Sequence, residues 1–119
     1  MSSSDSLINY RVEPATKVEG EISIPGDKSI SHRSIILGAI AEGESKITGF
    51  LEGEDNLATL KAFRSMGVEI SDPVAGELTI CGVGKYGLKA PAEEVYLGNS
   101  GTSMRLLTGL LSAQSFDCT

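Results

Sequence analysis

Two stretches of the chain, EISIPGDKSISHRSIILG (residues 21–38) and EVYLGNSGTSMRLLTGLL (residues 94–111), share one pattern that decides the fold. In each, alternating apolar residues predict a strand that ends at a glycine, and apolar residues at helical spacing then predict a helix. A shift of 72 or 73 positions aligns the two stretches. With a shift of 72 positions, three pairs of identical residues align within these stretches: Gly26–Gly98, Ser31–Ser103 and Arg33–Arg105. The recurrence predicts an internal structural repeat.

The residues around and between these stretches predict the rest of the repeating unit. Hydrophobic periodicity and turn residues predict strands at 7–13, 18–24, 46–50, 68–70 and 77–81, and helices at 29–41 and from 53–56 to Gly67. The last two strands form a hairpin across the sequence DPVAG. The segment from 18 to 81 therefore runs strand, helix, strand, helix, strand, strand, which is the order of an α/β unit.

The composition is that of one ordinary soluble globular domain. The chain has 119 residues, of which 40% are hydrophobic and 22% charged, with a formal net charge of −6 and a pI near 4.7. Nucleic acids and anionic membranes are bound mainly by clustered Lys and Arg, so a chain with this net negative charge is a poor partner for them. Any anion-binding site must therefore depend on a few neighbouring residues. Cys81 and Cys118 have no metal-type spacing, and we expect reduced thiols in a cytoplasmic protein.

The first candidate anion site is the predicted helix start at 28–33. A helix N-terminus exposes unpaired N–H groups and a partial positive charge, which favour an anion. Lys28 adds an ammonium group there, while Ser29 and Arg33 are four residues apart and share a helix face. The other interpretation is that Ser29 or Asp27 caps the helix and that the two basic side chains are only solvated.

The second candidate site is the helix start at 97–105. Gly98 and Gly101 let a ligand approach the backbone, Asn99 and Thr102 offer hydrogen bonds, and Arg105 follows Gly101 by one turn. A helix cap with two turn glycines would explain the same residues. Two such helix starts, brought together by an internal repeat, predict a substrate with two anionic groups.

His32 is the one histidine of the chain and could serve as a general base. It lies inside the predicted helix, beside an apolar face, where a histidine more often packs or faces solvent. The sequence contains no metal-ligand cluster and no nucleophile triad.

Three motifs carry a family resemblance: PGDKSISHR at 25–33, GFLEGED at 49–55 and GNSGTSMR at 98–105. In this order and spacing they resemble the N-terminal quarter of the 3-phosphoshikimate 1-carboxyvinyltransferase (5-enolpyruvylshikimate-3-phosphate synthase) family. The resemblance implies an inside-out barrel of two domains, each built from βαβαββ units, with one complete unit and the start of a second in this chain. Residues 1–25 would supply strands to the C-terminal domain, and residues 26–119 would form part of the N-terminal, substrate-binding domain.

The resemblance also implies a reaction and the residues that serve it. The family, which is the glyphosate target, transfers the enolpyruvyl group of phosphoenolpyruvate to shikimate 3-phosphate in aromatic amino acid biosynthesis, without metal or cofactor. Lys28 would lie between the two substrates. Ser29 and Arg33 would bind shikimate 3-phosphate. Asn99 and the N–H of Gly101 would bind phosphoenolpyruvate, and Thr102 and Arg105 would support that second pocket from the helix.

Several features depart from this pattern or leave alternatives open. Many family members have proline where this chain has Leu106, and alanines where it has Ser100 and Ser103. The acid/base groups of the second domain would lie beyond Thr119, so we expect the 119 residues alone to be inactive. The related UDP-N-acetylglucosamine enolpyruvyl transferases have asparagine at the position of Ser29, which disfavours them. A non-catalytic anion-binding module is the remaining alternative.

Overall fold

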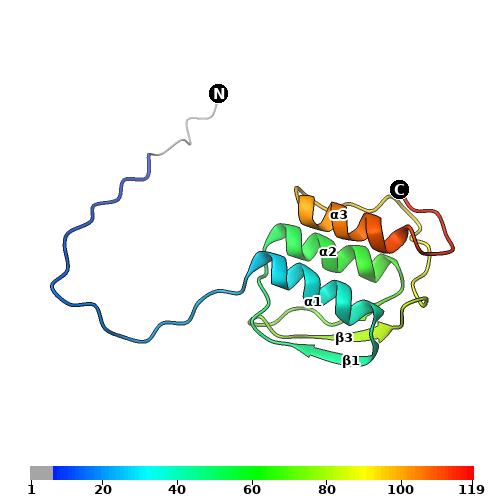
Figure 1. Ribbon diagram of the computed structural model, residues 1–119, viewed down its shortest axis with the longest axis horizontal. Coiled ribbons are helices and arrows are strands. Elements are labelled where there is room, and N and C mark those ends of the chain that lie inside the picture. Colours follow the sequence, from blue (N-terminus) through cyan, green and yellow to red (C-terminus); the bar gives the residue numbers. More distant parts are fainter. Residues whose placement is uncertain (1–6) are drawn as a thin grey trace.

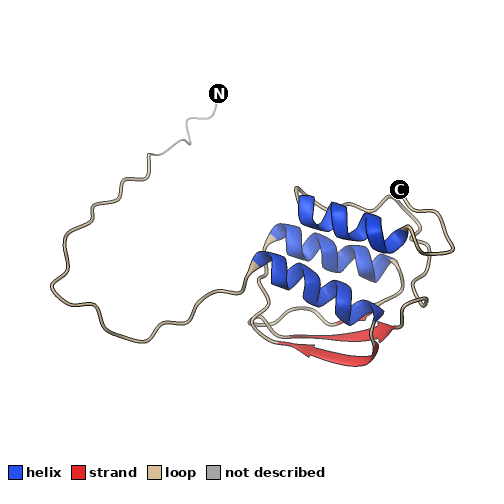
Figure 2. Ribbon diagram, in the orientation of Figure 1, coloured by secondary structure: helices blue, strands red, loops and turns tan. Residues whose placement is uncertain are grey.

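A computed structural model describes residues 7–119. From residue 28 onward, three helices form a layer that covers one face of a small sheet (Figure 2). In chain order the elements are α1 (Lys28–Ile40), β1 (Glu42–Ile47), α2 (Glu54–Ser65), β2 (Glu69–Ile70), β3 (Leu78–Val83) and α3 (Gly101–Leu111). This alternation of helices and strands confirms the predicted α/β class. The two predicted helices at 29–41 and 53–67 are confirmed to within about two residues at each end.

The sheet is antiparallel, with strand order β1-β3-β2. Ile47 pairs with Leu78 at one end of β1, and Ile70 pairs with Ile80 across β2 and β3. The predicted hairpin of β2 and β3 is confirmed. Its turn is closed by Val74 and Glu77, and both residues between them, Ala75 and Gly76, have positive φ, as the tight hairpin turns that match strand twist require.

The core lies between the helices and the sheet. Its most deeply buried apolar side chains come from α1, α2, the residue that follows α2, β3 and α3: Ile35, Ala39, Leu60, Phe63, Met66, Ile80 and Leu107. Each large side chain of this kind stabilises the fold by roughly 1.5–3 kcal/mol. α1 crosses β3 so closely that a β-carbon on Gly38 would lie 2.8 Å from Ile80 Cδ1, which explains a glycine inside a helix.

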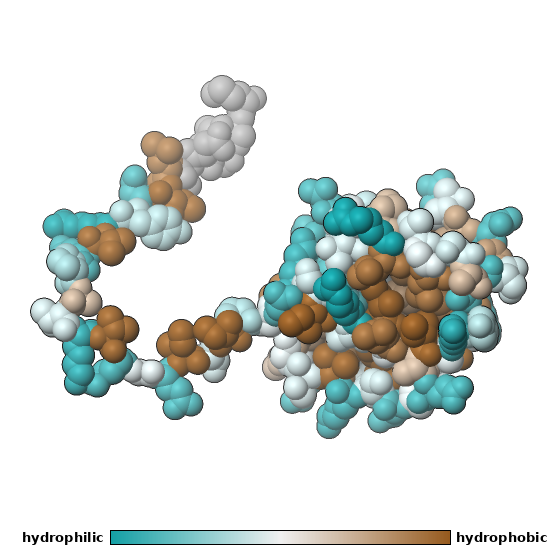
Figure 3. All heavy atoms as spheres, viewed as in Figure 1, coloured by the Kyte–Doolittle hydropathy of each residue, from teal (hydrophilic) through white to brown (hydrophobic). Residues whose placement is uncertain are grey.

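The strands predicted at 7–13 and 18–24 are wrong for this chain as it stands. Residues 7–27 form no helix or strand, and they leave the body as a single extended trace (Figure 1). Figure 3 shows apolar side chains spaced along this trace, and Val18 is 92% exposed. The physical reason is that a strand needs a neighbouring strand to bond its N–H and C=O groups, and no described element lies alongside.

Two further predictions need correction. The strand predicted at 94–97 is absent: this segment is a loop, in which the Val95 N–H donates to the carbonyl of Thr119 at 2.7 Å. The strand predicted at 46–50 instead spans Glu42–Ile47, because β1 pairs along its whole length with β3. Residues 28–83 therefore show the order αβαββ, which lacks the leading strand of the predicted unit, and α3 follows. Within residues 7–119, no helix is long and apolar enough to cross a membrane.

Candidate functional site

The three helices lie side by side, and their N-termini meet at one end of the layer (Figure 1). Asp27 caps α1 by accepting the Ile30 N–H at 2.8 Å, and Ser100 caps α3 by accepting the Ser103 N–H at 3.1 Å. Of the two residues considered as the first cap, Asp27 has that role and the Ser29 hydroxyl does not. The caps at Asp27 and Ser100 are 73 positions apart, so the two helix starts correspond at the longer of the two shifts.

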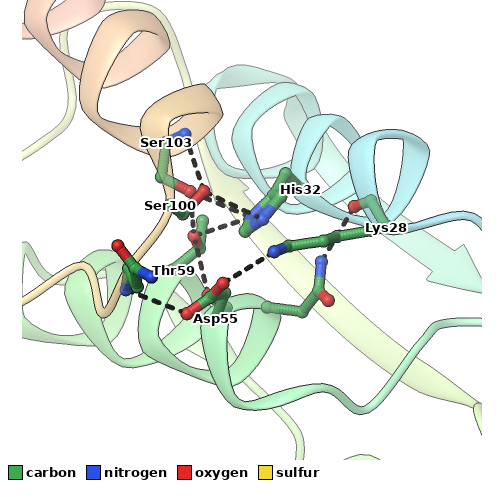
Figure 4. A network of polar contacts seen from close by, with 8 residues as sticks. Lys28, His32, Asp55, Thr59, Ser100 and Ser103 are labelled. Atoms are coloured by element: carbon green, nitrogen blue, oxygen red, sulfur yellow. Dashed lines mark hydrogen bonds and ion pairs between the residues drawn. The ribbon is translucent and has the colours of Figure 1, made fainter.

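Asp55, in the first turn of α2, joins the two predicted anion sites (Figure 4). One carboxylate oxygen accepts from the Lys28 ammonium at 2.7 Å, and the other accepts from the backbone N–H of Asn99 at 3.0 Å. These hydrogen bonds, first that of Lys28 and then that of Asn99, lower the pKa of the Asp55 carboxyl below its ordinary value. The carboxylate therefore stays ionised between the two helix starts.

Asp55 is not among the site residues that the sequence predicts. The available signal was its place in the motif at 49–55, where it ends a run that also contains Glu52 and Glu54. Nothing in that run distinguishes Asp55 from its acidic neighbours, because the distinction comes from tertiary contacts with Lys28 and Asn99.

Gly98 allows the approach of the second helix start to Asp55. Its φ of +65° is one that glycine adopts without strain, and a β-carbon there would lie 2.5 Å from the nearer Asp55 carboxylate oxygen. A glycine at this position therefore serves both the turn before α3 and the bond between Asp55 and the Asn99 N–H.

The residues of the first predicted site occupy the first two turns of α1. Lys28 is half exposed, Ser29 is half-buried and Arg33 is exposed. Asn56, on α2, holds the backbone of this helix start, because its side-chain amide donates to the Lys28 carbonyl at 2.9 Å. Lys28 thus has a fixed backbone and an ammonium group that is held by Asp55 and still open to solvent.

The residues of the second predicted site surround the start of α3. Asn99 and Gly101 are exposed, and Thr102 is half-buried. The Arg105 side chain folds back along its helix, so that a β-carbon on Gly101 would lie 3.0 Å from the guanidinium nitrogen Nη1. A guanidinium beside a helix N-terminus is a favourable place for a phosphate or carboxylate.

His32 is fully buried behind these two sites (Figure 4). Its Nδ1 lies 2.9 Å from the Thr59 hydroxyl and 3.0 Å from the Ser103 hydroxyl, and its Nε2 lies 3.3 Å from the Ser100 hydroxyl. Burial, and then the positive charge of Lys28, lower the pKa of the imidazole. Of the two environments expected for His32, packing and solvent, the ring occupies the first, and it is held by polar partners that the sequence did not indicate.

A groove of about 560 Å³ adjoins Asp55. α2 forms one wall and the loop before α3 forms the other, with Asp55, Lys61, Tyr96 and Asn99 among the lining residues. Both charged and apolar side chains border it. Space for a small molecule is therefore present directly beside the contact between α2 and the second helix start.

The sequence model of EPSP synthase (3-phosphoshikimate 1-carboxyvinyltransferase) matches residues 12–119, which is nearly the whole chain. The chain belongs to the EPSP synthase family. The 3-phosphoshikimate 1-carboxyvinyltransferase of Hydrogenovibrio crunogenus is 59% identical over 111 residues, which cover 93% of this chain and 25% of that protein. The protein of the same name from Geobacter sp. is 63% identical over 109 residues, which cover 91% of this chain and 25% of that protein.

A solved EPSP synthase agrees in fold as well. The structure of EPSP synthase from Acinetobacter baumannii superposes with a TM-score of 0.80 and 69% sequence identity, covering 83% of this chain and 22% of that one. The chain spans about a quarter of the length of the curated relatives that it matches. Membership of the EPSP synthase family is therefore carried by sequence and by fold, over that quarter.

Proposed function

We propose that this chain supplies the N-terminal substrate-binding part of an EPSP synthase. In the proposed reaction, the 5-hydroxyl oxygen of shikimate 3-phosphate forms a bond to C2 of phosphoenolpyruvate and loses its proton. The bond from C2 to the phosphate oxygen breaks, and the phosphate leaves with a net gain of that proton. The observation that carries the proposal is the pair of hydrogen bonds by which Asp55 joins Lys28 to Asn99. Asp55 thereby holds the two helix starts, each with a basic side chain, next to each other, as the binding of two anionic substrates requires.

The proposed roles of the site residues are those that the family resemblance implies, and their places at these helix starts are compatible with them. Lys28 lies between the substrates, where its ammonium offsets the repulsion between two anions in contact. The other proposed contacts are Ser29 and Arg33 to the shikimate carboxylate, Asn99 and the Gly101 N–H to phosphoenolpyruvate, and Thr102 and Arg105 as support for that pocket. Fixed positive groups at two helix starts also orient the attacking oxygen, which lowers the entropic cost of the reaction.

We further propose that residues 26–119 belong to a domain of repeated βαβαββ units, and that residues 1–25 supply strands to the C-terminal domain. Residues 1–6 of that segment lie outside the described residues. Support comes from residues 18–24, whose apolar side chains alternate with polar ones and are exposed. Such a pattern is typical of a strand with one buried face.

The test uses a chimera in which residues 1–119 replace the corresponding segment of the Acinetobacter baumannii EPSP synthase. We expect the chimera to release phosphate when both substrates are present, and the 119 residues alone to release none. A folded chimera that releases no phosphate would contradict the proposal. Release of phosphate with UDP-N-acetylglucosamine as the acceptor, and none with shikimate 3-phosphate, would instead assign the chain to the related transferases.

A further inference from the structure

Four polar side chains that the proposed reaction does not use form a cluster behind the site. The His32 cluster consists of His32, Thr59, Ser100 and Ser103, all at most 7% exposed. Its members come from α1, α2 and the start of α3, so it is the place where polar side chains of all three helices meet (Figure 4). The Thr59 and Ser103 hydroxyl oxygens are also 2.7 Å apart, which closes a triangle with His32 Nδ1.

The bonds of the His32 cluster are satisfied together with a neutral ring. With the proton on Nδ1, the ring donates to Thr59 or Ser103 and Nε2 accepts from the Ser100 hydroxyl, while the Ser100 oxygen accepts the Ser103 N–H. The Thr59 hydroxyl has its own acceptor in the carbonyl of Asp55, at 3.3 Å. Loss of one member would leave a buried donor or acceptor without its partner, which is costly in a site that excludes water.

The two serines of the cluster depend on the same ring. Ser100 and Ser103 both bond to His32. An alanine at either position would remove one of the bonds that satisfy the buried ring. The two serines and the histidine thus form a set whose members depend on one another.

We propose that His32 is a positioning residue that sets the spacing between the Lys28 helix start and the Asn99–Gly101 helix start, and thereby the affinity for phosphoenolpyruvate. This inference rests on the proposed function. Ser100 is the covalent link between Asn99 and Gly101, so the bond from Ser100 to His32 fixes both proposed phosphoenolpyruvate contacts relative to α1. Ser29 and Arg33 lie on the same helix as His32, so their spacing is set by α1 itself.

The kinetic test measures KM for each substrate in the chimera. Ser100→Ala removes both the bond to His32 and the cap of α3, and it should raise KM for phosphoenolpyruvate by roughly tenfold or more, with little change in KM for shikimate 3-phosphate. Ser112→Ala deletes the same group at the far end of α3, where it is exposed, and should change neither KM. Equal changes in both KM values, or the same result for the two alanine variants, would overturn the inference.

Conservative variants separate positioning from folding. His32→Gln places an amide near the Nε2 position and should keep the bond to Ser100, whereas His32→Asn mimics Nδ1 and should lose it. KM for phosphoenolpyruvate should therefore stay near its original value in His32→Gln and rise in His32→Asn. Ser100→Thr, which retains the hydroxyl, should behave like the unaltered chimera. A rise in KM for His32→Gln and Ser100→Thr as large as for His32→Asn would contradict the inference.

A second readout does not depend on activity. Amide hydrogen exchange at Asn99 and Gly101 should be faster in Ser100→Ala and His32→Asn than in Ser112→Ala, because the loop loses its tie to α1. Unchanged exchange would overturn the positioning role even in an active chimera. A chimera that is inactive but shows the accelerated exchange would contradict the proposed function and leave the structural role of His32 in place.

Discussion

The Lys28 ammonium lies 2.7 Å from the Asp55 carboxylate, although the two residues belong to different helices and are 27 positions apart. Lys28 is half exposed, whereas only 18% of the Asp55 side chain is exposed. This partly buried carboxylate therefore holds an ammonium group that remains accessible to an anion. Since the same carboxylate accepts the Asn99 N–H, both helix starts are oriented by one residue.

Lys28→Ala should abolish most transfer in the chimera while leaving the fold intact. The residue is the first of α1 and lies outside the buried core, whereas its charge would offset repulsion between the substrates. Loss of one such electrostatic group lowers kcat by roughly 10²- to 10³-fold. Lys46→Ala, which removes an exposed lysine of β1, is the matched control for steady-state kinetics and thermal unfolding. Near-normal turnover in Lys28→Ala would refute the assignment.

Asp55→Asn should lower kcat/KM roughly tenfold, because the amide keeps the shape of the carboxylate but not the charge that orients Lys28. The effect on stability should depend on pH. The pKa of Asp55 is lowered, so its stabilisation is complete above the ordinary value near 3.8 and is lost as pH falls through the lower folded value. Urea unfolding at pH 7 and pH 3 measures this difference. Glu54→Gln, an exposed neighbour in the same turn, should affect neither quantity.

The sequence predicted the helices and the hairpin because their signals are local. Apolar spacing, the caps and the turn at 74–77 act over a few residues, and these elements formed close to the predicted bounds. The same alternation predicted strands at 7–13, 18–24 and 94–97, which did not form. A strand depends on a partner that alternation cannot supply, and the described part of the chain offers none alongside.

The residues of the candidate site likewise fall into those that local sequence predicts and those that only tertiary contacts reveal. Lys28 and Arg105 follow from the chemistry of helix starts, which a short stretch of sequence reveals. Asp55 and His32 act through bonds between residues 27 to 71 positions apart, so no local pattern marks them.

Stability that depends on His32 should fall as pH falls below about 6.5. Burial and Lys28 lower the pKa of the ring in the folded chain, so the unfolded chain binds a proton first as the solution is acidified. The charged groups that act on the ring are Lys28 and Arg33, which oppose its protonation, and Asp55, which favours it. We expect the free energy of unfolding of the chimera to decrease from pH 7 to pH 5 more steeply than that of His32→Asn. Parallel pH profiles would contradict a buried neutral ring.

Gly101→Ala should preserve the fold and weaken ligands of the proposed phosphoenolpyruvate pocket. Gly101 begins α3, where alanine is well accepted, but the new methyl group would meet the Arg105 guanidinium at 3.0 Å and displace it. Glyphosate, which has one more atom between its carboxylate and its phosphorus, should lose more affinity than phosphoenolpyruvate, measured as the ratio of inhibition constant to KM in the chimera. Gly109→Ala, at an open position of the same helix, is the control. Equal losses for both ligands would count against this geometry.

Ile22→Asp tests whether the extended segment is a strand of the complete enzyme. In this chain Ile22 is 80% exposed, so a carboxylate there should cost nothing. If residues 18–24 join a sheet with one buried face, the same change buries a charge and should destabilise the chimera by about 2–4 kcal/mol. Ser23→Asp places the carboxylate on the opposite face of the strand and should have little effect. Denaturant midpoints that fall equally, or not at all, for the two variants would show that this segment has no buried face in the complete enzyme.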